Sequence, residues 1–276
     1  MKEIKAIVLC STRFAMPSIQ QLQYAGMLSA VAVPAFSEET SEYAEVLLQN
    51  TGIPVIKISE KTFNEELIKI IAEHGINLGL ILTFSYKISE AVYLLPTLGF
   101  YNFHPGPLPL YRGPDPIFQQ IKNAEAHAGL ALHKIDQNFD TGPVLMKKMM
   151  RIEERDTYGM LTSKLASLAV EMLGVLIKMI SMDISLPEKK QDEDAATYFK
   201  KQSGTDVIIR WQSMNAKEIV ALAHSCNPWN KGALTKINNR IMWIPLAKKG
   251  ISAKESTFPS GKIITIAENK LLVSLS

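Results

Sequence analysis

Short apolar runs alternate with helix-like segments near the start of this chain, and the alternation limits the folds open to it. Apolar runs occupy residues 4–9, 28–33, 55–58 and 78–83. Helical spacing of apolar residues is seen at 17–24, 41–49 and 62–73. Strands that alternate with crossover helices usually pair in parallel. The pattern therefore predicts an α/β fold with a doubly wound, mostly parallel sheet.

The pattern changes in the second half of the chain. Two further strands are predicted at residues 129–134 and 144–150, followed by a long helix at 157–180. A polar, charged stretch then leads to one helix at 215–224 and several short strand-like runs. We expect a first domain at residues 1–183, a linker at 184–205 and a small β-rich domain at 206–276.

Composition excludes several classes of protein. A net charge of +3 gives no independent argument for a nucleic-acid partner. Two cysteines, Cys10 and Cys226, are too few for a disulfide framework or a zinc cluster. His74, His127, His133 and His224 have no ligand spacing, so we expect no metal. The long helix is interrupted by charged residues, which argues against a membrane span. We expect a soluble, cytoplasmic protein, and the oligomeric state is left open.

The segment YNFHPGPLPLYRGPDP, residues 101–116, joins a predicted strand end to a stiff loop. Asn102 and His104 share one face of the strand, because alternate strand residues point the same way. They lie at the carboxyl edge of the sheet, where open α/β folds bind ligands. Prolines stiffen the loop, and Gly106 allows close approach of a ligand. Strand ends and loops also carry such residues without any function, so both interpretations stay open here.

Asp140 lies in the sequence FDTGPVL, between the two later strands. An aspartate before Thr-Gly is commonly a turn or cap residue. Beside an imidazole, however, a buried carboxylate orients the ring and raises its pKa. Sequence spacing alone does not place Asp140 next to His104.

The motifs NFHPGPLPLYRG and FDTGPVL together resemble the signature of the 10-formyltetrahydrofolate-dependent formyltransferases. This family includes methionyl-tRNA formyltransferase, sugar N-formyltransferases, formylation domains of peptide synthetases and glycinamide ribonucleotide formyltransferase. The stretch LGLILTFSYKISEAVYLLPTLGFYNFHPG is similar to the family's approach to the site. TYFKKQSGTDVIIRW and NPWNKGALTKINNRIMWIP resemble the C-terminal domain of the tRNA enzyme, a small OB-like β-barrel. The chain ends in LLVSLS, so the expected barrel is either abbreviated or part of a longer protein.

The resemblance implies formyl transfer from 10-formyltetrahydrofolate, a co-substrate, to a primary amine without a metal. Asn102 and His104 would donate to the developing oxyanion, and Asp140 would orient His104 and help remove the amine proton. The candidates for contact with the pterin are Leu82, Thr83, Phe84, Ser85, Tyr86, Ile135, Asp136, Gln137, Asn138 and Phe139. The candidates on the acceptor side are Gly106, Arg112 and Asp115, although Arg112 is equally consistent with a solvated turn.

Some departures from the family pattern concern the acceptor. Gly106 stands where the family usually has serine, and Pro114-Asp115-Pro116 resembles the peptide-synthetase domains more than the tRNA enzyme. The tRNA-acting enzymes carry a long basic loop after the second strand, whereas this chain has a short stretch that includes Glu38, Glu39, Glu42 and Glu45. Acidic groups repel phosphates. A basic group near the C-terminus argues in the opposite direction, for a partner with phosphates. It contains Lys231, Lys236, Arg240, Lys248 and Lys249.

Three hypotheses follow from these residues. The favoured one is an N-formyltransferase acting on an amino-sugar nucleotide or a carrier-bound aminoacyl group. The first alternative is a methionyl-tRNA formyltransferase. The second alternative is a formyl-folate hydrolase or an inactive folate-binding module.

Overall fold

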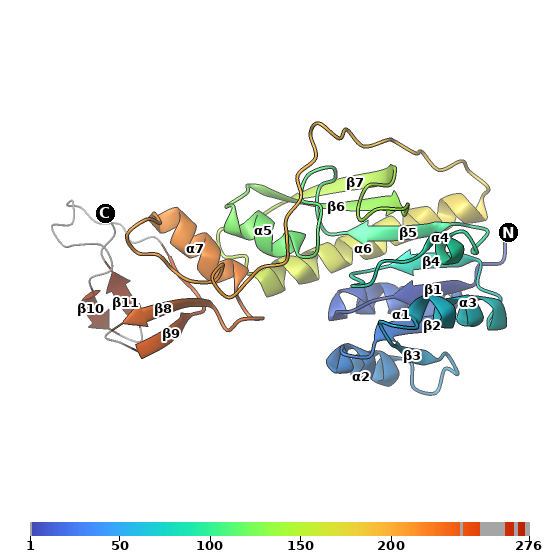
Figure 1. Ribbon diagram of the computed structural model, residues 1–276, viewed down its shortest axis with the longest axis horizontal. Coiled ribbons are helices and arrows are strands. Elements are labelled where there is room, and N and C mark those ends of the chain that lie inside the picture. Colours follow the sequence, from blue (N-terminus) through green and yellow to red (C-terminus); the bar gives the residue numbers. More distant parts are fainter. Residues whose placement is uncertain (1, 238–239, 249–262, 268–269, 274–276) are drawn as a thin grey trace. The chain divides into compact units, whose positions relative to one another are not determined.

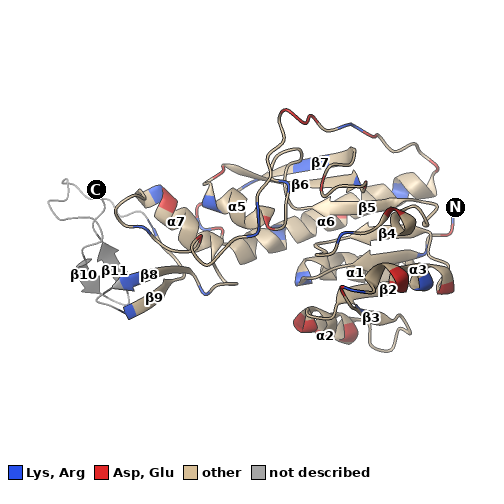
Figure 2. Cartoon of the chain, viewed as in Figure 1, with Lys and Arg blue, Asp and Glu red and all other residues tan. Residues whose placement is uncertain are grey.

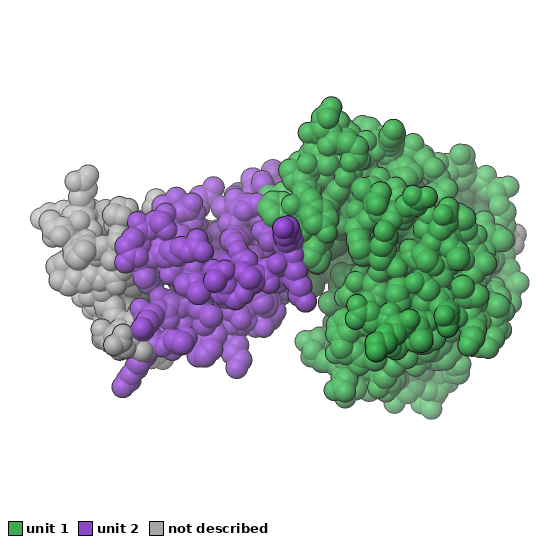
Figure 3. Space-filling model, viewed as in Figure 1, with its two compact units in different colours: residues 1–114, 129–150, 162–199 green, residues 115–128, 151–161, 200–276 purple. Residues whose placement is uncertain are grey.

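The computed structural model describes residues 2–237, 240–248, 263–267 and 270–273. The chain divides into two compact units, each assembled from separate stretches of sequence (Figure 3). Unit 1 contains residues 1–114, 129–150 and 162–199, and unit 2 contains residues 115–128, 151–161 and 200–276. The domain boundaries predicted after residues 183 and 205 remain a proposal.

A single sheet organises unit 1 (Figure 1). Within the described residues, seven strands follow the order β3-β2-β1-β4-β5-β6-β7. The pairs β3–β2, β2–β1, β1–β4 and β4–β5 are parallel, and β5–β6 is antiparallel. The predicted mostly parallel α/β sheet is therefore confirmed. The strands are β1 Ala6–Leu9, β2 Leu28–Pro34, β3 Val55–Ile58, β4 Leu78–Ile81, β5 Phe100–His104, β6 His127–Lys134 and β7 Val144–Arg151.

Apolar side chains at helical spacing explain how the helices pack. In α3, Phe63–Glu73, the side chains of Phe63, Leu67, Ile70 and Ile71 are buried and belong to the same core cluster as residues of β1 and β2. The other elements before the motif are η1 Arg13–Ala15, α1 Met16–Tyr24, α2 Glu38–Leu47 and α4 Glu90–Tyr93.

The expected start of α2 at Ser41 is wrong, because the helix begins at Glu38. Glu38 and Glu39 occupy the first turn, where negative charge is favoured by the helix dipole. The Ser41 hydroxyl donates to the carbonyl oxygen of Glu38 inside the helix. Only residues 35–37 therefore connect β2 to α2.

The long helix α6, Tyr158–Ser181, is apolar enough to cross a membrane by length and composition, with a mean hydropathy of 1.6. Its buried residues nevertheless recur at helical spacing, as Leu161, Leu165, Met172 and Leu176 show. Such one-sided burial is typical of a core helix.

Residues 188–199 form an extended segment, called the strap below, that is hydrogen-bonded along unit 1. Its start pairs with β7 through Lys189 and Val144, whose N–H groups donate to each other's carbonyls at 3.0 and 2.8 Å. Its end pairs with Arg112, whose N–H donates to Thr197 and whose carbonyl accepts from Phe199, both at 2.9 Å. The stretch expected to be a linker therefore contains a segment held against the first unit.

Unit 2 contains α5 Pro116–Lys122, α7 Ala216–Ser225 and two antiparallel hairpins. The hairpins are β8 Ala233–Ile237 with β9 Arg240–Ile244, and β10 Ile263–Ala267 with β11 Lys270–Val273. A capping box between Asn215 and Glu218 begins α7. The expected small β-rich C-terminal domain is confirmed, and its described strands form antiparallel pairs, while Lys249 lies outside the described residues.

Candidate active site

The two polar residues of the motif lie at the carboxyl end of β5, inside the sheet. Asn102 is level with Ile81 of the parallel strand β4 and with His133 of the antiparallel strand β6. His104 is level with Ala131 of β6. Pairing with β4 and β6 therefore fixes the backbone position of Asn102, and pairing with β6 fixes that of His104.

Asp140 brings the polar side chains together from the turn between β6 and β7. Its Oδ1 lies 3.3 Å from His104 Nδ1, 3.3 Å from Asn102 Nδ2 and 3.7 Å from His133 Nε2. Its Oδ2 accepts a hydrogen bond from the Gly113 N–H at 2.9 Å. Asn102, His104, His133 and Asp140 are called the Asp140 cluster below.

Hydrogen-bond partners indicate the protonation of the two imidazoles. His133 Nδ1 faces the Lys134 carbonyl oxygen at 2.9 Å, so this nitrogen carries the proton. Its Nε2 then accepts from Asn102 Nδ2 at 3.0 Å. His104 differs, because Nε2 faces the Tyr111 carbonyl at 2.8 Å and Nδ1 faces a carboxylate. Two acceptors favour the doubly protonated, cationic ring.

Electrostatics favour the same charged pair. Burial by itself would lower the pKa of His104, but the charge and hydrogen bond of Asp140 outweigh it, and the pKa is raised. Burial by itself would raise the pKa of Asp140, but the charge and hydrogen bond of His104 hold that pKa well below its usual range. Arg112 opposes the charge on His104 to a smaller extent. The cluster therefore holds an ionised Asp140 beside a cationic His104.

Backbone geometry determines how the cluster closes. Asp140 has φ of +60°, a left-handed conformation that non-glycine residues adopt uncommonly. A Cβ on Gly142 would overlap the Lys134 carbonyl, so glycine lets the turn lie against β6. A Cβ on Gly106 would lie 2.8 Å from His104 Nε2. Glycine at this position therefore leaves room for the contact between His104 and Tyr111.

The structure thus brings Asn102, His104 and Asp140 together as expected, and it adds His133, which sequence reasoning treated as ordinary. His133 is buried and contacts Asn102 directly. The signal that would have found it is the antiparallel register, in which it pairs with Asn102. The catalytic roles of these residues belong to the proposal below.

The residues expected at the folate lie on two loops near β4 and β6. Leu82 is fully buried, and Thr83 and Ser85 pair through their hydroxyls with Thr12 and Ser11. Phe84, Tyr86 and Ile135 pack against the core cluster of α3. Asp136 holds its own turn by accepting from the Asn138 N–H and the Thr141 hydroxyl. Tyr86 also makes ring contacts with Phe36, Phe63 and Phe84.

A cavity of about 340 Å³ lies beside these loops. Gln137 is the expected folate residue that lines it. The remaining lining residues, missed by the sequence reasoning, are Lys87, Ile88, Ser89, Glu90 and Tyr93. Residues around the start of α4 and the turn that leads to Asp140 therefore line the same cavity.

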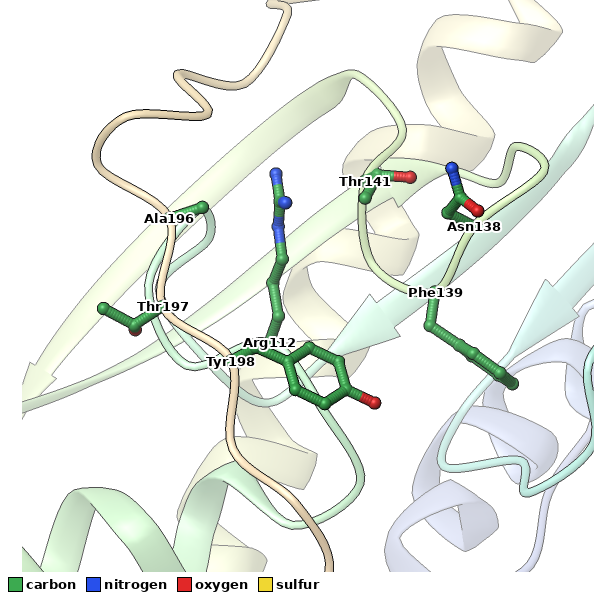
Figure 4. A pocket seen from close by; sticks show the side chains of 7 residues that line it. All are labelled: Arg112, Asn138, Phe139, Thr141, Ala196, Thr197 and Tyr198. Atoms are coloured by element: carbon green, nitrogen blue, oxygen red, sulfur yellow. The ribbon is translucent and has the colours of Figure 1, made fainter.

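Arg112 was expected on the acceptor side. In the structure its positive charge is paired with a carboxylate of the same unit, unit 1. The side chain is buried and donates to Glu193 at 2.8 and 2.7 Å and to Gln191 at 3.2 and 2.9 Å. Figure 4 shows it between the strap and the turn before Asp140, beside a cavity of about 300 Å³. The cavity is lined by Arg112, Asn138, Phe139, Thr141, Ala196, Thr197 and Tyr198.

Asp115, also expected on the acceptor side, belongs to unit 2. Its carboxylate accepts from Gln202 Nε2 at 2.6 Å and is hydrogen-bonded to Tyr158. Burial raises the pKa of Asp115. Within its unit the carboxylate is therefore already satisfied. Among the described residues, no group of three or more His, Cys, Asp or Glu side chains is arranged to hold a metal ion.

Comparison with known proteins agrees with this fold. The chain matches the formyl transferase family model over residues 4–177 and the model of the formyl transferase C-terminal domain over residues 201–276. It is 30% identical over 236 residues to the methionyl-tRNA formyltransferase of Caldanaerobacter subterraneus subsp. tengcongensis. The matched residues make up 82% of this chain and 75% of the relative.

Solved structures share the fold at lower identity. The N-formyltransferase from Helicobacter canadensis, solved with folinic acid and dTDP-3-aminofucose, is 19% identical with a TM-score of 0.63, covering 86% of this chain and 85% of that one. A sugar N-formyltransferase from Shewanella sp. is 14% identical with a TM-score of 0.69, covering 91% and 100%.

The fold and the family matches define a one-carbon group transferase that uses 10-formyltetrahydrofolate as co-substrate. The chain belongs to the formyl transferase family, as the sequence motifs indicated.

Proposed function

We propose that this protein transfers the formyl group to the primary amine of a small or carrier-bound acceptor, such as an amino-sugar nucleotide or a carrier-bound aminoacyl group. The observation that carries the proposal is the region between β2 and α2. Residues 35–37 leave no room for a long loop, and the first turn of α2 holds Glu38 and Glu39. A surface that binds tRNA phosphates needs the opposite charge.

Charges around α2 reinforce this argument. Figure 2 shows acidic positions, coloured red, along α2, and the sequence of this helix also contains Glu42 and Glu45. Arg13, which reaches the helix, is paired with Glu39 at 3.1 Å and lies 4.6 Å from the centre of the Tyr43 ring. Its positive charge is thus already compensated. This surface would disfavour a polyphosphate chain while tolerating a neutral or cationic acceptor group.

The Asp140 cluster supplies the groups that formyl transfer requires. As the acceptor amine attacks the formyl carbon, negative charge grows on the formyl oxygen, and nearby N–H donors stabilise it. Asn102 and His104 would supply these donors. The contact of Asn102 with Asp140 is long for a charged hydrogen bond, at 3.3 Å, so this contact is readily exchanged for substrate.

Asp140 is better suited to charging His104 than to taking a proton at neutral pH. Its pKa is held low, and a general base works best with a pKa near the working pH. Its negative charge instead keeps the His104 ring cationic beside the reacting oxygen. We propose orientation and charging of His104 as the main role of Asp140, with proton removal from the amine as a lesser one.

The folate is proposed to bind along the cavity lined by Lys87, Tyr93 and Gln137. Polar and aromatic walls suit the flat, polar ring system of a folate. The ring cluster around Tyr86 adds apolar surface nearby on unit 1.

A methionyl-tRNA formyltransferase is the second candidate. It is favoured by relatives of that name and by the family match at residues 201–276. Lys231, Lys236 and Arg240 are exposed in unit 2 and would suit a phosphate backbone.

An acceptor screen tests the proposal. The protein is incubated with 10-formyltetrahydrofolate and a panel of amines, comprising dTDP-amino sugars, aminoacyl carrier proteins and charged initiator tRNA. Mass spectrometry then detects products heavier by one formyl group. The proposal expects a product from the first or second class. Formate release that is independent of any amine would instead support the hydrolase alternative.

A further inference from the structure

Gln191 of the strap contacts the turn that carries Asp140. Its Nε2 donates to the carbonyl oxygens of Asp140 at 2.8 Å and Gly142 at 2.7 Å. The side chain is 6% exposed, so water competes little for these bonds. The Gln191 amide therefore binds two carbonyl groups of one turn and holds that turn in place around Asp140. The backbone of Asp140 is in the left-handed conformation there.

The opposite end of the same side chain holds the other partner of Asp140. Gln191 Oε1 accepts from Arg112 Nε at 3.2 Å and Nη2 at 2.9 Å. The residue after Arg112 is Gly113, whose N–H donates to Asp140 Oδ2. Gln191 therefore joins the backbone of Asp140 to the segment that binds its carboxylate.

Glutamine is suited to this bridge by its chemistry. The two carbonyls need two donors, and the guanidinium needs an acceptor. A primary amide supplies both from one side chain. Glutamate lacks the donors, and asparagine is one methylene too short to reach both partners.

We infer that Gln191 is a positioning residue for formyl transfer, which holds the Asp140 carboxylate against His104 from outside the reacting groups. The inference rests on the role proposed above for Asp140. Without the bridge, the turn is freed from the strap, and the distance between Asp140 and His104 increases. The cationic form of His104 is then less stabilised by the Asp140 carboxylate.

The titration of His104 tests this inference without any acceptor. NMR follows the ring C–H signals of the five histidines with pH, and the His104 signal is assigned by its loss in His104→Gln. In Gln191→Met the pKa of His104 should fall by about 0.5 pH unit or more, because an opposite charge within a few ångströms shifts a pKa by roughly one to three units. Arg112 keeps its pair with Glu193 in this variant, so its own effect on His104 is retained.

Two further variants separate positioning from a loss of stability. Gln120→Met removes another buried glutamine, in unit 2, whose amide donates to the Pro116 carbonyl at 3.0 Å. It should leave the pKa of His104 unchanged. Gln191→Asn keeps a polar side chain and should lower that pKa to a smaller extent, and it carries the test where Gln191→Met does not fold.

An unchanged pKa of His104 in the folded Gln191 variants would overturn the inference. Asp140→Asn, titrated in parallel, distinguishes this from a failure of the proposed function. If Asp140→Asn also leaves the pKa unchanged, the pairing of Asp140 with His104 is wrong, and the inference fails with it. If only Asp140→Asn lowers the pKa, the pairing stands and the role of Gln191 is refuted.

Discussion

His104 Nδ1 lies 3.3 Å from Asp140 Oδ1, and both side chains are at least nine-tenths buried. Burial disfavours charge on either group alone, yet each shifts the pKa of the other toward the charged form. An isolated buried charge is costly, whereas a paired and hydrogen-bonded one is tolerated. The two residues therefore act as one ion pair, which keeps a cationic imidazole at the carboxyl edge of the sheet.

Asp140→Asn should leave the fold intact and reduce formyl transfer by roughly 10²-fold or more. Asparagine has the same shape and adopts the left-handed backbone conformation more readily than most residues. The change removes the charge that supports the His104 ring. Circular dichroism checks the fold, and turnover with an accepted amine checks the rate. Near-normal turnover by a folded variant would show that the charge of Asp140 is dispensable.

The pH dependence of turnover should reflect the raised pKa of His104. A ring that donates in the transition state is active while protonated, so the rate should fall as pH rises through the pKa of His104 in the folded protein. That alkaline fall should lie above the ordinary value of 6.5. A fall in rate centred below pH 6.5 would contradict a His104 imidazolium that is stabilised by Asp140. The acid side of the profile should follow the acceptor amine, which attacks only when neutral.

Stability should follow the same pair. The pKa of His104 is raised in the folded state, so its contribution is fully present below 6.5 and is lost as pH rises through the folded value. The pKa of Asp140 is lowered, so its contribution is present above 3.8 and is lost as pH falls below that value. Urea unfolding across pH should show both losses, and Asp140→Asn should flatten them. Identical curves for the two proteins would argue against the pair.

His133→Leu should lower turnover about tenfold while leaving the KM for the folate nearly unchanged. The substitution removes the acceptor that fixes one amide hydrogen of Asn102, and small misplacements of a catalytic group are costly. His127→Leu is the matched control, because His127 lies at the exposed start of the same strand. Equal effects of the two substitutions would mean that His133 acts only through stability.

Folinic acid should stabilise the protein through the cavity beside α4. A ligand at 100 times its Kd contributes about 2.7 kcal/mol, which should raise the Tm by roughly 5 °C or more for a chain of this size. Gln137→Ala, which removes a wall residue on the turn before Asp140, should reduce the shift without changing the Tm of the free protein. A Tm that folinic acid does not move at saturation would place the folate elsewhere.

The parallel sheet and the motif were predictable because they depend on local patterns. Apolar runs such as residues 78–81 show their burial directly, and Asn102 and His104 are two residues apart on a strand. His133 could not be recognised in the same way, since its role depends on the antiparallel register that pairs it with Asn102. Register is set by contacts distant in sequence.

The strap escaped prediction for a different reason. Its composition is polar and charged, as in a linker, and it buries few apolar side chains. The strap is held by hydrogen bonds between residues that are distant in sequence, such as those from Gln191 to Asp140 and from Arg112 to Thr197. Hydrogen bonds of this kind have no periodicity in sequence. The same holds for the buried side chain of Arg112, because no local pattern reveals its pairing with Glu193.

The central claim is most directly tested by competition between acceptors in one reaction. The protein receives 10-formyltetrahydrofolate together with charged initiator tRNA and a dTDP-amino sugar or aminoacyl carrier already accepted in the screen. Formyl products are then counted at low and at physiological salt. We expect formyl transfer predominantly to the small or carrier-bound amine, with little dependence on salt. Efficient formylation of the tRNA that declines steeply as salt is added would contradict the proposal, because that dependence reports phosphate contacts.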